Sequence, residues 1–167
     1  MSQPRPIFTE PLTARAFAPF GDVIEPAGAP DMVINRGMAE RFHDLARLDF
    51  GPETGGGRAG ISLFRARPRA LPYRLDLLER HPLGAQAFLP MQATPFLVIV
   101  APDEGGLPGT PRAFVTAPGQ GVSYLRGTWH GVLTPLSEPA LFAVVDRIGE
   151  GDNLEEMHLD TPYIIEK

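Results

Sequence analysis

Short apolar runs, separated by turns rich in glycine and proline, recur along the whole chain. In most of them apolar and polar residues alternate, which is typical of a strand that turns one face inward. The run 94–101 is apolar almost throughout, which indicates a strand buried on both faces. About ten such strands, spaced by roughly 8–12 residues, predict an all-β sandwich or barrel. The expected strands are 20–24, 32–36, 61–67, 71–81, 86–89, 94–101, 112–116, 122–125, 129–133, 141–147 and 163–166.

The remaining segments complete the predicted layout. Thr13 is a candidate N-cap for a short helix over 14–17, which ends before Pro19 because proline cannot continue a helix. The glycine-rich residues 51–60 are expected to form a loop, and 163–166 a last strand at a sheet edge. No linker or repeat divides the chain, so we expect 1–167 to be a single domain.

Composition narrows the class of protein. Of 167 residues, 43% are apolar and 21% charged, which is typical of a globular domain with a core. The net charge of -5 disfavours nucleic acid as a partner, because phosphate binding needs a basic surface. The absence of cysteine excludes disulfides and thiolate metal sites. The N-terminus has no apolar signal segment and no run is long enough to cross a bilayer, so we expect a cytoplasmic protein without a membrane partner.

Two short motifs carry groups that bind metals or move protons. The first is Glu79-x-His81, followed after four residues by Gln86, and the second ends in Gly127-x-x-His130. Residues two apart on a strand point to the same face, so Glu79 and His81 project together. These spacings are similar to the two motifs of cupins, which are small jelly-roll barrels. The resemblance implies a cupin-like double-stranded β-helix with a short N-terminal helix and peripheral strands, in which the two motifs face each other.

The donor set leaves two alternatives open. Carboxylate and imidazole are competent ligands for a divalent transition metal, while a glutamine amide is a weak one. Glu79, His81, Gln86 and His130 can therefore hold nickel, manganese or zinc, or act without a metal by positioning groups and transferring protons. The ordinary alternative for either histidine is a hydrogen-bonded residue of the core.

A wider resemblance covers most of the chain, from about residue 11 to 163. The blocks LERHPLGAQAFLP, SYLRGTWHGVL and VVDRIGEGDNLEE, with PLTARAFAPFGDVIE and MVINRGMAERFHDLARLDF before them, resemble the ureidoglycolate lyase family. This resemblance implies a homodimeric carbon–nitrogen lyase of allantoin and purine catabolism that converts ureidoglycolate to glyoxylate and urea. The chain departs from the family at Leu125 and Gly131, where histidines are common.

The implied reaction needs a base for the substrate hydroxyl, an acid for the urea nitrogen and a cation for the carboxylate. Histidine suits the first two tasks near neutral pH, so His81 and His130 share them in either order, while Glu79 orients His81 or acts as the base. Arginine suits a carboxylate. Residues 146–153 fit either the barrel mouth or an ordinary turn. The candidates for binding substrate are Arg126, Arg36, Arg147, Tyr124 and Gln86.

Two other functions fit the same motifs. One is a different cupin enzyme acting on a small acid, either an isomerase or a dioxygenase. The other is a cupin that binds a ligand without catalysis. The replacement of family histidines at Leu125 and Gly131 is what keeps both alternatives open.

Overall fold

Two packed β-sheets form the body of the protein. The computed structural model describes residues 3–51 and 54–167, and among these it contains one four-residue α-helix and one short 3-10 turn. The larger sheet has seven strands, and its strand β11 also pairs with β8, so that six of the strands close into a barrel. In order across this sheet they are β11 (Arg112–Val115), β1 (Arg5–Pro11), β16 (Glu155–Glu166), β6 (Tyr73–Arg80), β13 (Trp129–His130), β8 (Phe96–Ala101) and β14 (Thr134–Pro135).

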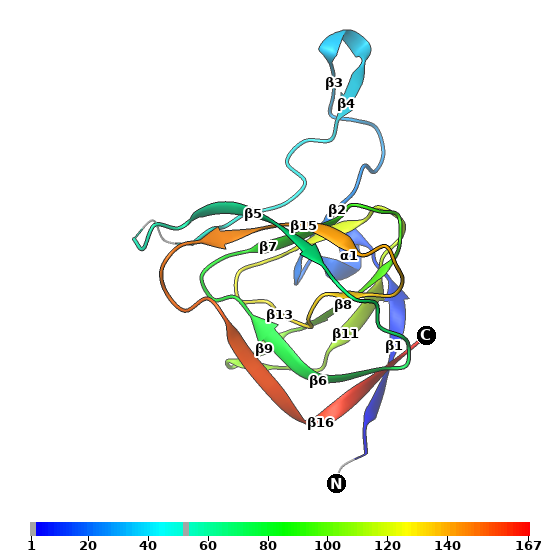
Figure 1. Cartoon of the computed structure of the whole chain (residues 1–167), viewed down its shortest axis with the longest axis vertical. Helices are drawn as coiled ribbons and strands as arrows, with labels where there is room; N and C mark the ends of the chain where they lie inside the picture. Colours follow the sequence, from blue (N-terminus) through cyan, green and yellow to red (C-terminus); the bar gives the residue numbers. More distant parts are fainter. Residues whose placement is uncertain (1–2, 52–53) are drawn as a thin grey trace.

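The second sheet has five strands and lies across the barrel (Figure 1). Two small hairpins complete the fold, one of which is interrupted by a 3-10 turn at its tip. The five strands are β2 (Gly21–Ile24), β12 (Gly121–Tyr124), β7 (Gln86–Pro90), β15 (Leu141–Ile148) and β5 (Arg58–Arg65). The hairpins are β3 (Met32–Ile34) with η1 (Asn35–Gly37) and β4 (Ala39–Arg41), and β9 (Asp103–Glu104) with β10 (Leu107–Pro108). The prediction of an all-β barrel is confirmed.

Strand β8 is buried on both faces, as its apolar sequence predicts, and it separates two hydrophobic cores. One set of alternating side chains packs against the five-stranded sheet, and the other fills the closed barrel. The first set is Phe96, Val98 and Val100, and the second is Leu97, Ile99 and Ala101. Because successive side chains of a strand point to opposite faces, this single strand supports both cores.

The predicted N-terminal helix is present as α1 (Ala14–Phe17). The Thr13 hydroxyl accepts a hydrogen bond from the Ala16 amide at 3.2 Å, which caps the first turn. The helix places the fully buried Phe17 ring against Phe114 and Tyr124. The helix therefore closes one side of the core between the sheets.

The segment 163–166, expected at a sheet edge, belongs to an interior strand, so that prediction is wrong. Strand β16 starts at Glu155, pairs with β6 on one side and pairs in parallel with β1 on the other. The N-terminal strand β1 thus covers the edge that β16 would otherwise expose. Pairing between the two ends of a chain leaves no local sequence pattern, which is why it was not predicted.

Two other expected strands are shorter than their apolar runs. The run 129–133 forms a strand only over Trp129–His130, and the run 32–36 turns at Asn35 and Arg36, which both have positive φ. The expected loop 51–60 ends at Arg58, where β5 begins, and its residues 52 and 53 lie outside the described part of the chain.

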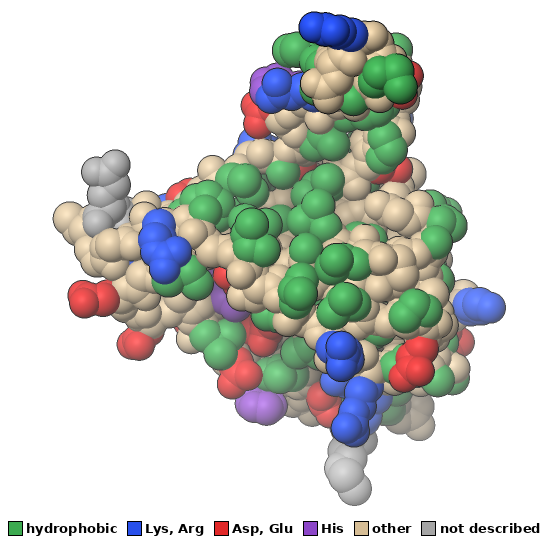
Figure 2. Space-filling model, turned by 45° about the horizontal axis from the view of Figure 1, so that its top comes forward, with side chains coloured by type: hydrophobic (Ala, Val, Ile, Leu, Met, Phe, Trp, Pro, Cys, Tyr) green, Lys and Arg blue, Asp and Glu red, His purple; other side chains and the backbone are tan. Residues whose placement is uncertain are grey.

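The hairpin of β3 and β4 forms an arm, defined as residues 32–41, that projects away from the two sheets (Figure 1). Its exposed side chains include several large apolar ones. Figure 2 shows hydrophobic side chains on the arm and on the face below it. The apolar side chains of the arm are Met32, Val33, Ile34 and Met38, which are 38–85% exposed. None of the helices in the described residues is both long and apolar enough to cross a membrane.

The packing of the core between the sheets predicts that two phenylalanines differ strongly in their contribution to stability. Phe114 is fully buried and packs edge-on against Phe17, whereas Phe8 is 62% exposed. We expect Phe114→Ala to lower the free energy of unfolding by about 3–5 kcal/mol, because it leaves a cavity. The control Phe8→Ala should change it by less than about 1 kcal/mol. Urea unfolding curves of both variants check this, and equal losses would contradict the described core.

Candidate active site

The two predicted motifs meet at one end of the space between the sheets. In the larger sheet, Glu79 on β6 lies directly opposite His130 on β13. In the smaller sheet, Gln86 on β7 lies opposite Tyr124 on β12. The Tyr124 and His130 rings stack across the gap, with centroids 4.3 Å apart and planes 5° from parallel. Strand register therefore brings four of the predicted groups together.

His81 lies just beyond the end of β6 and joins this cluster through both ring nitrogens. Its Nδ1 is 2.7 Å from the backbone oxygen of Asn153, and its Nε2 is 3.1 Å from Oε1 of Gln86. Gln86 in turn donates from Nε2 to Oδ2 of Asp146 at 3.2 Å. Because the Asp146 carboxylate accepts hydrogen bonds, the amide of Gln86 keeps its oxygen toward His81. Both nitrogens of His81 therefore face acceptor oxygens.

His130 is a buried, uncharged ring. Burial lowers its pKa to about 3, so it is neutral at pH 7. Its Nδ1 is 2.9 Å from the Gly131 backbone oxygen and 3.9 Å from Oε1 of Glu79. With the proton on Nδ1, the lone pair lies on Nε2, which is buried and has no hydrogen-bond partner among the described residues.

The half-buried carboxyl of Glu79 is suited to accept a proton. Burial raises its pKa above the ordinary value and the charge of Glu156 adds to this, while the charge of His81 acts in the opposite direction. A raised pKa brings a carboxylate closer to the range in which it works as a base near neutral pH. Burial also raises the pKa of Tyr124 beyond its usual range, so that its hydroxyl stays protonated.

The cluster also has the donor atoms of a metal site. One ligand atom from each of Glu79, His81 and His130 lies within 4.8 Å of the others. Two imidazoles and a carboxylate suit a divalent transition metal, and ligation would satisfy the orphaned Nε2 of His130. Gln86, predicted as a fourth ligand, is instead occupied by His81 and Asp146.

The predicted arginines lie in three different places. Arg126 is near the cluster, because the next residue, Gly127, donates its amide to the His81 backbone oxygen at 2.9 Å. Its guanidinium binds Asp49 at 2.6 Å and holds the pKa of that carboxyl below its usual range. Arg36 is at the tip of the arm, which projects away from the sheets (Figure 1).

Arg147 is buried on the other side of its strand. Asp146 points to Gln86, and successive residues of β15 face opposite ways. The guanidinium of Arg147 lies against Gly51 and Gly149, where a Cβ atom would come within 2.9 and 2.0 Å of it. Within one chain, the structure therefore keeps both Arg36 and Arg147 apart from the histidines.

Two polar groups in the cluster, Asp146 and Asn153, were assigned no role from the sequence. For Asp146 the sequence does contain a signal. Phe142, Val144 and Asp146 alternate along β15 and so share one face, and a carboxylate that follows two fully buried residues on that face indicates a polar site. For Asn153 there is none, because it lies in a loop that only the fold brings back to His81.

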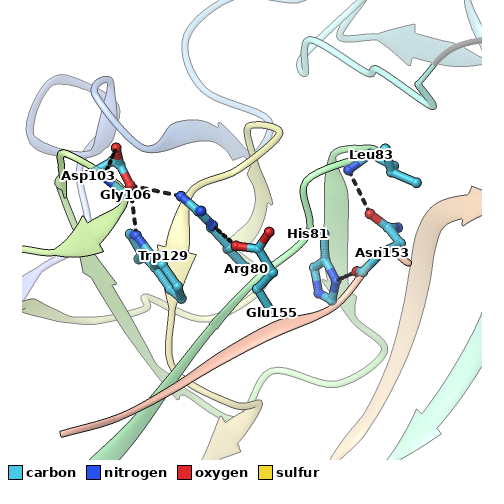
Figure 3. A network of polar contacts seen from close by, with 8 residues as sticks. All are labelled: Arg80, His81, Leu83, Asp103, Gly106, Trp129, Asn153 and Glu155. Atoms are coloured by element: carbon cyan, nitrogen blue, oxygen red, sulfur yellow. Dashed lines mark hydrogen bonds and ion pairs between the residues drawn. The ribbon is translucent and has the colours of Figure 1, made fainter. Parts of the chain in front are cut away.

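A second polar network involves the residues that directly precede the two histidines in the sequence (Figure 3). Arg80 binds Asp103 at 2.8 Å and Glu155 at 2.6 Å, and lies over the Trp129 ring. Trp129 donates from Nε1 to the same Asp103 carboxylate at 2.9 Å. Arg80 and Trp129 directly precede His81 and His130 and both bind the Asp103 carboxylate, so the Asp103 contacts link the strand ends that carry both rings, whereas Glu155 only joins β16 to β6.

Gly131 lies next to this cluster without a side chain. Its amide donates to the Ile99 backbone oxygen at 2.9 Å, and a Cβ atom at this position would be 3.2 Å from Cβ of Ile99. Position 131 therefore adds no third imidazole to His81 and His130.

Comparisons with known proteins identify the family of this chain. The family model described as Ureidoglycolate lyase matches residues 4–166. A ureidoglycolate lyase of Rhodobacter capsulatus is 61% identical over 96% of this chain and 98% of its own length. Those of Chelativorans sp. and Burkholderia mallei are 56% and 54% identical, over 96% and 90% of this chain and 96% and 87% of their own lengths. This chain belongs to the ureidoglycolate lyase family.

Proposed function

We propose that this protein cleaves ureidoglycolate to glyoxylate and urea. The names of its relatives support this substrate, and one feature of the site supports the chemistry. That feature is a half-buried carboxyl with a raised pKa, Glu79, beside a histidine that presents an N–H group, His81. A base and an acid side by side are what the elimination of urea requires.

The reaction then balances with these two groups. Glu79 takes the proton of the substrate hydroxyl, and the carbon–oxygen bond becomes the carbonyl of glyoxylate. The carbon–nitrogen bond breaks, and its electron pair goes to the nitrogen of urea. That nitrogen receives a proton from Nε2 of His81, and in this acid form both ring nitrogens carry hydrogen, as the two acceptor oxygens that face them require.

The other groups orient these two. His130 is neutral and too buried to meet the substrate directly, so it forms a wall of the site beside Glu79, 3.9 Å away, and is held by its stack on Tyr124. Arg126 binds the substrate carboxylate, because it is the predicted arginine next to the cluster and its guanidinium is partly exposed.

Product analysis with active-site variants tests this function. We expect the wild-type protein to release urea and glyoxylate together from ureidoglycolate. Glu79→Gln and His81→Gln should each lower kcat by about a hundredfold, because each removes a proton-transfer group. The control His158→Gln changes an exposed histidine on β16 and should keep the wild-type kcat.

Two results would contradict the proposal. Ammonia and carbon dioxide in place of urea would make the protein an amidohydrolase. Binding without turnover would make it a ligand-binding protein of the same fold.

We also propose that Glu79, His81 and His130 can hold a divalent transition-metal ion, such as nickel, manganese or zinc. Their donor atoms and spacing support this. A bound ion would supply Lewis-acid polarisation of the substrate oxygen. Metal ligation needs a lone pair on Glu79 and on a ring nitrogen of His81, whereas proton transfer needs Glu79 to accept a proton and His81 to carry one, so the two roles exclude each other at one moment.

Metal binding and chelation separate these roles. We expect calorimetry to detect binding of at least one of the three ions, and His130→Ala to weaken it at least about tenfold, since one of three ligands is lost. The control His158→Ala should bind like the wild type. Absence of binding by all three ions would contradict the metal site. Loss of turnover on chelation would show that the three residues act by holding the ion. Retained turnover would show that Glu79 and His81 transfer protons directly.

We propose further that the protein is a homodimer and that the arm contributes to the contact. Four large apolar side chains on the arm are exposed, which is typical of a surface covered by a partner. We expect sedimentation to give twice the 18.1-kDa chain mass, and Val33→Glu to shift it toward the monomer. Met91→Glu, at a residue that is similarly exposed but off the arm, should not. A monomeric wild type would contradict this proposal.

A further inference from the structure

We propose that Asn153 is a positioning residue for the reaction, because it fixes the orientation of the His81 ring. The proposal rests on the proposed function for the role of His81 as an acid. Asn153 takes no part in strand pairing. It contacts His81 from the loop that precedes β16.

Asn153 makes two contacts with the segment 81–83 (Figure 3). Its backbone oxygen accepts a hydrogen bond from Nδ1 of His81 at 2.7 Å. Its side-chain Oδ1 accepts another from the backbone amide of Leu83 at 2.8 Å. The two bonds lie on either side of Pro82, so one residue holds both ends of this short segment.

This segment needs an anchor from outside its strand. Strand β6 ends at Arg80, so neither His81 nor Leu83 takes part in a backbone ladder, and the Gly127 amide holds only the backbone oxygen of His81, at 2.9 Å. Pro82 has no amide hydrogen, which leaves the Leu83 amide as the first donor after His81. The side chain of Asn153 satisfies this donor, and its backbone oxygen accepts from the imidazole.

The bond to Nδ1 has a direct consequence for the chemistry. A carbonyl oxygen accepts but cannot donate, so it keeps hydrogen on Nδ1 and turns Nε2 toward Gln86 and the cluster. Without the Oδ1 bond to Leu83 the loop is free to move its carbonyl, and the ring loses the partner that sets its direction.

A neighbouring contact offers a matched control. Glu155 lies two residues further along and binds Arg80 at 2.6 Å, so it ties the same two segments together without touching the His81 ring. A residue that only fastens β16 to β6 would behave like Glu155. A residue that positions His81 would behave differently.

The test compares Asn153→Ala, Asn153→Asp and Glu155→Gln. We expect Asn153→Ala to lower kcat about tenfold while KM stays within about threefold, because the loss concerns proton transfer rather than binding. Asn153→Asp keeps an acceptor oxygen for the Leu83 amide and should restore kcat to within about threefold. Glu155→Gln should keep the wild-type kcat. If Asn153→Ala does not fold, Asn153→Ser takes its place in the comparison.

Nitrogen-15 NMR of the imidazole gives a second readout without substrate. The wild-type His81 ring should show a protonated, slowly exchanging Nδ1, which Asn153→Ala loses and both other variants keep. This readout holds even if the wild type does not release urea, so it separates failure of the positioning role from failure of the proposed function. Wild-type kcat in Asn153→Ala, or an unchanged His81 signal in that variant, would overturn the proposal.

Discussion

The two-sided burial of β8 is the constraint on which both halves of the molecule depend. Its alternate side chains fill the closed barrel and the core between the sheets, so a one-residue shift in register would exchange the two sets and place each side chain in the wrong core. Strand β13 pairs with β8 on one side and with β6 on the other. The packing of β8 therefore determines where β13 lies, and with it the position of His130 opposite Glu79.

The cluster combines groups that are rigid for different reasons. His130 is fixed by burial, by stacking on Tyr124 and by the Arg80 and Trp129 network behind it. His81 has no such support from a core, since its ring is half-buried and lies past the end of its strand. Its orientation depends on two hydrogen bonds and on a tilted contact with the His130 ring, whose centroid is 5.2 Å away. The two histidines thus occupy one site with very different freedom to move during a reaction.

Local patterns in the sequence were sufficient for most of the longer strands and for part of the site, but not for β1 or the short hairpin strands β4, β9 and β10. Alternation identified β6 and β15, and the spacing of Glu79, His81 and His130 identified residues that do converge. The parallel pairing of β1 with β16 was not predictable, because contacts between chain ends leave no periodic signal. Asn153 was not assigned a role for the same reason. Arg147 was proposed on chemistry alone, which does not tell which face of β15 it occupies.

Gly131 connects the site to the interior of the barrel. A Cβ atom at this position would be 3.2 Å from Cβ of Ile99, one of the side chains that fill the barrel, so a larger residue here would require Ile99 to shift by a few tenths of an ångström. The residue that follows His130 is therefore constrained by the packing of β8 as well as by the chemistry of the site.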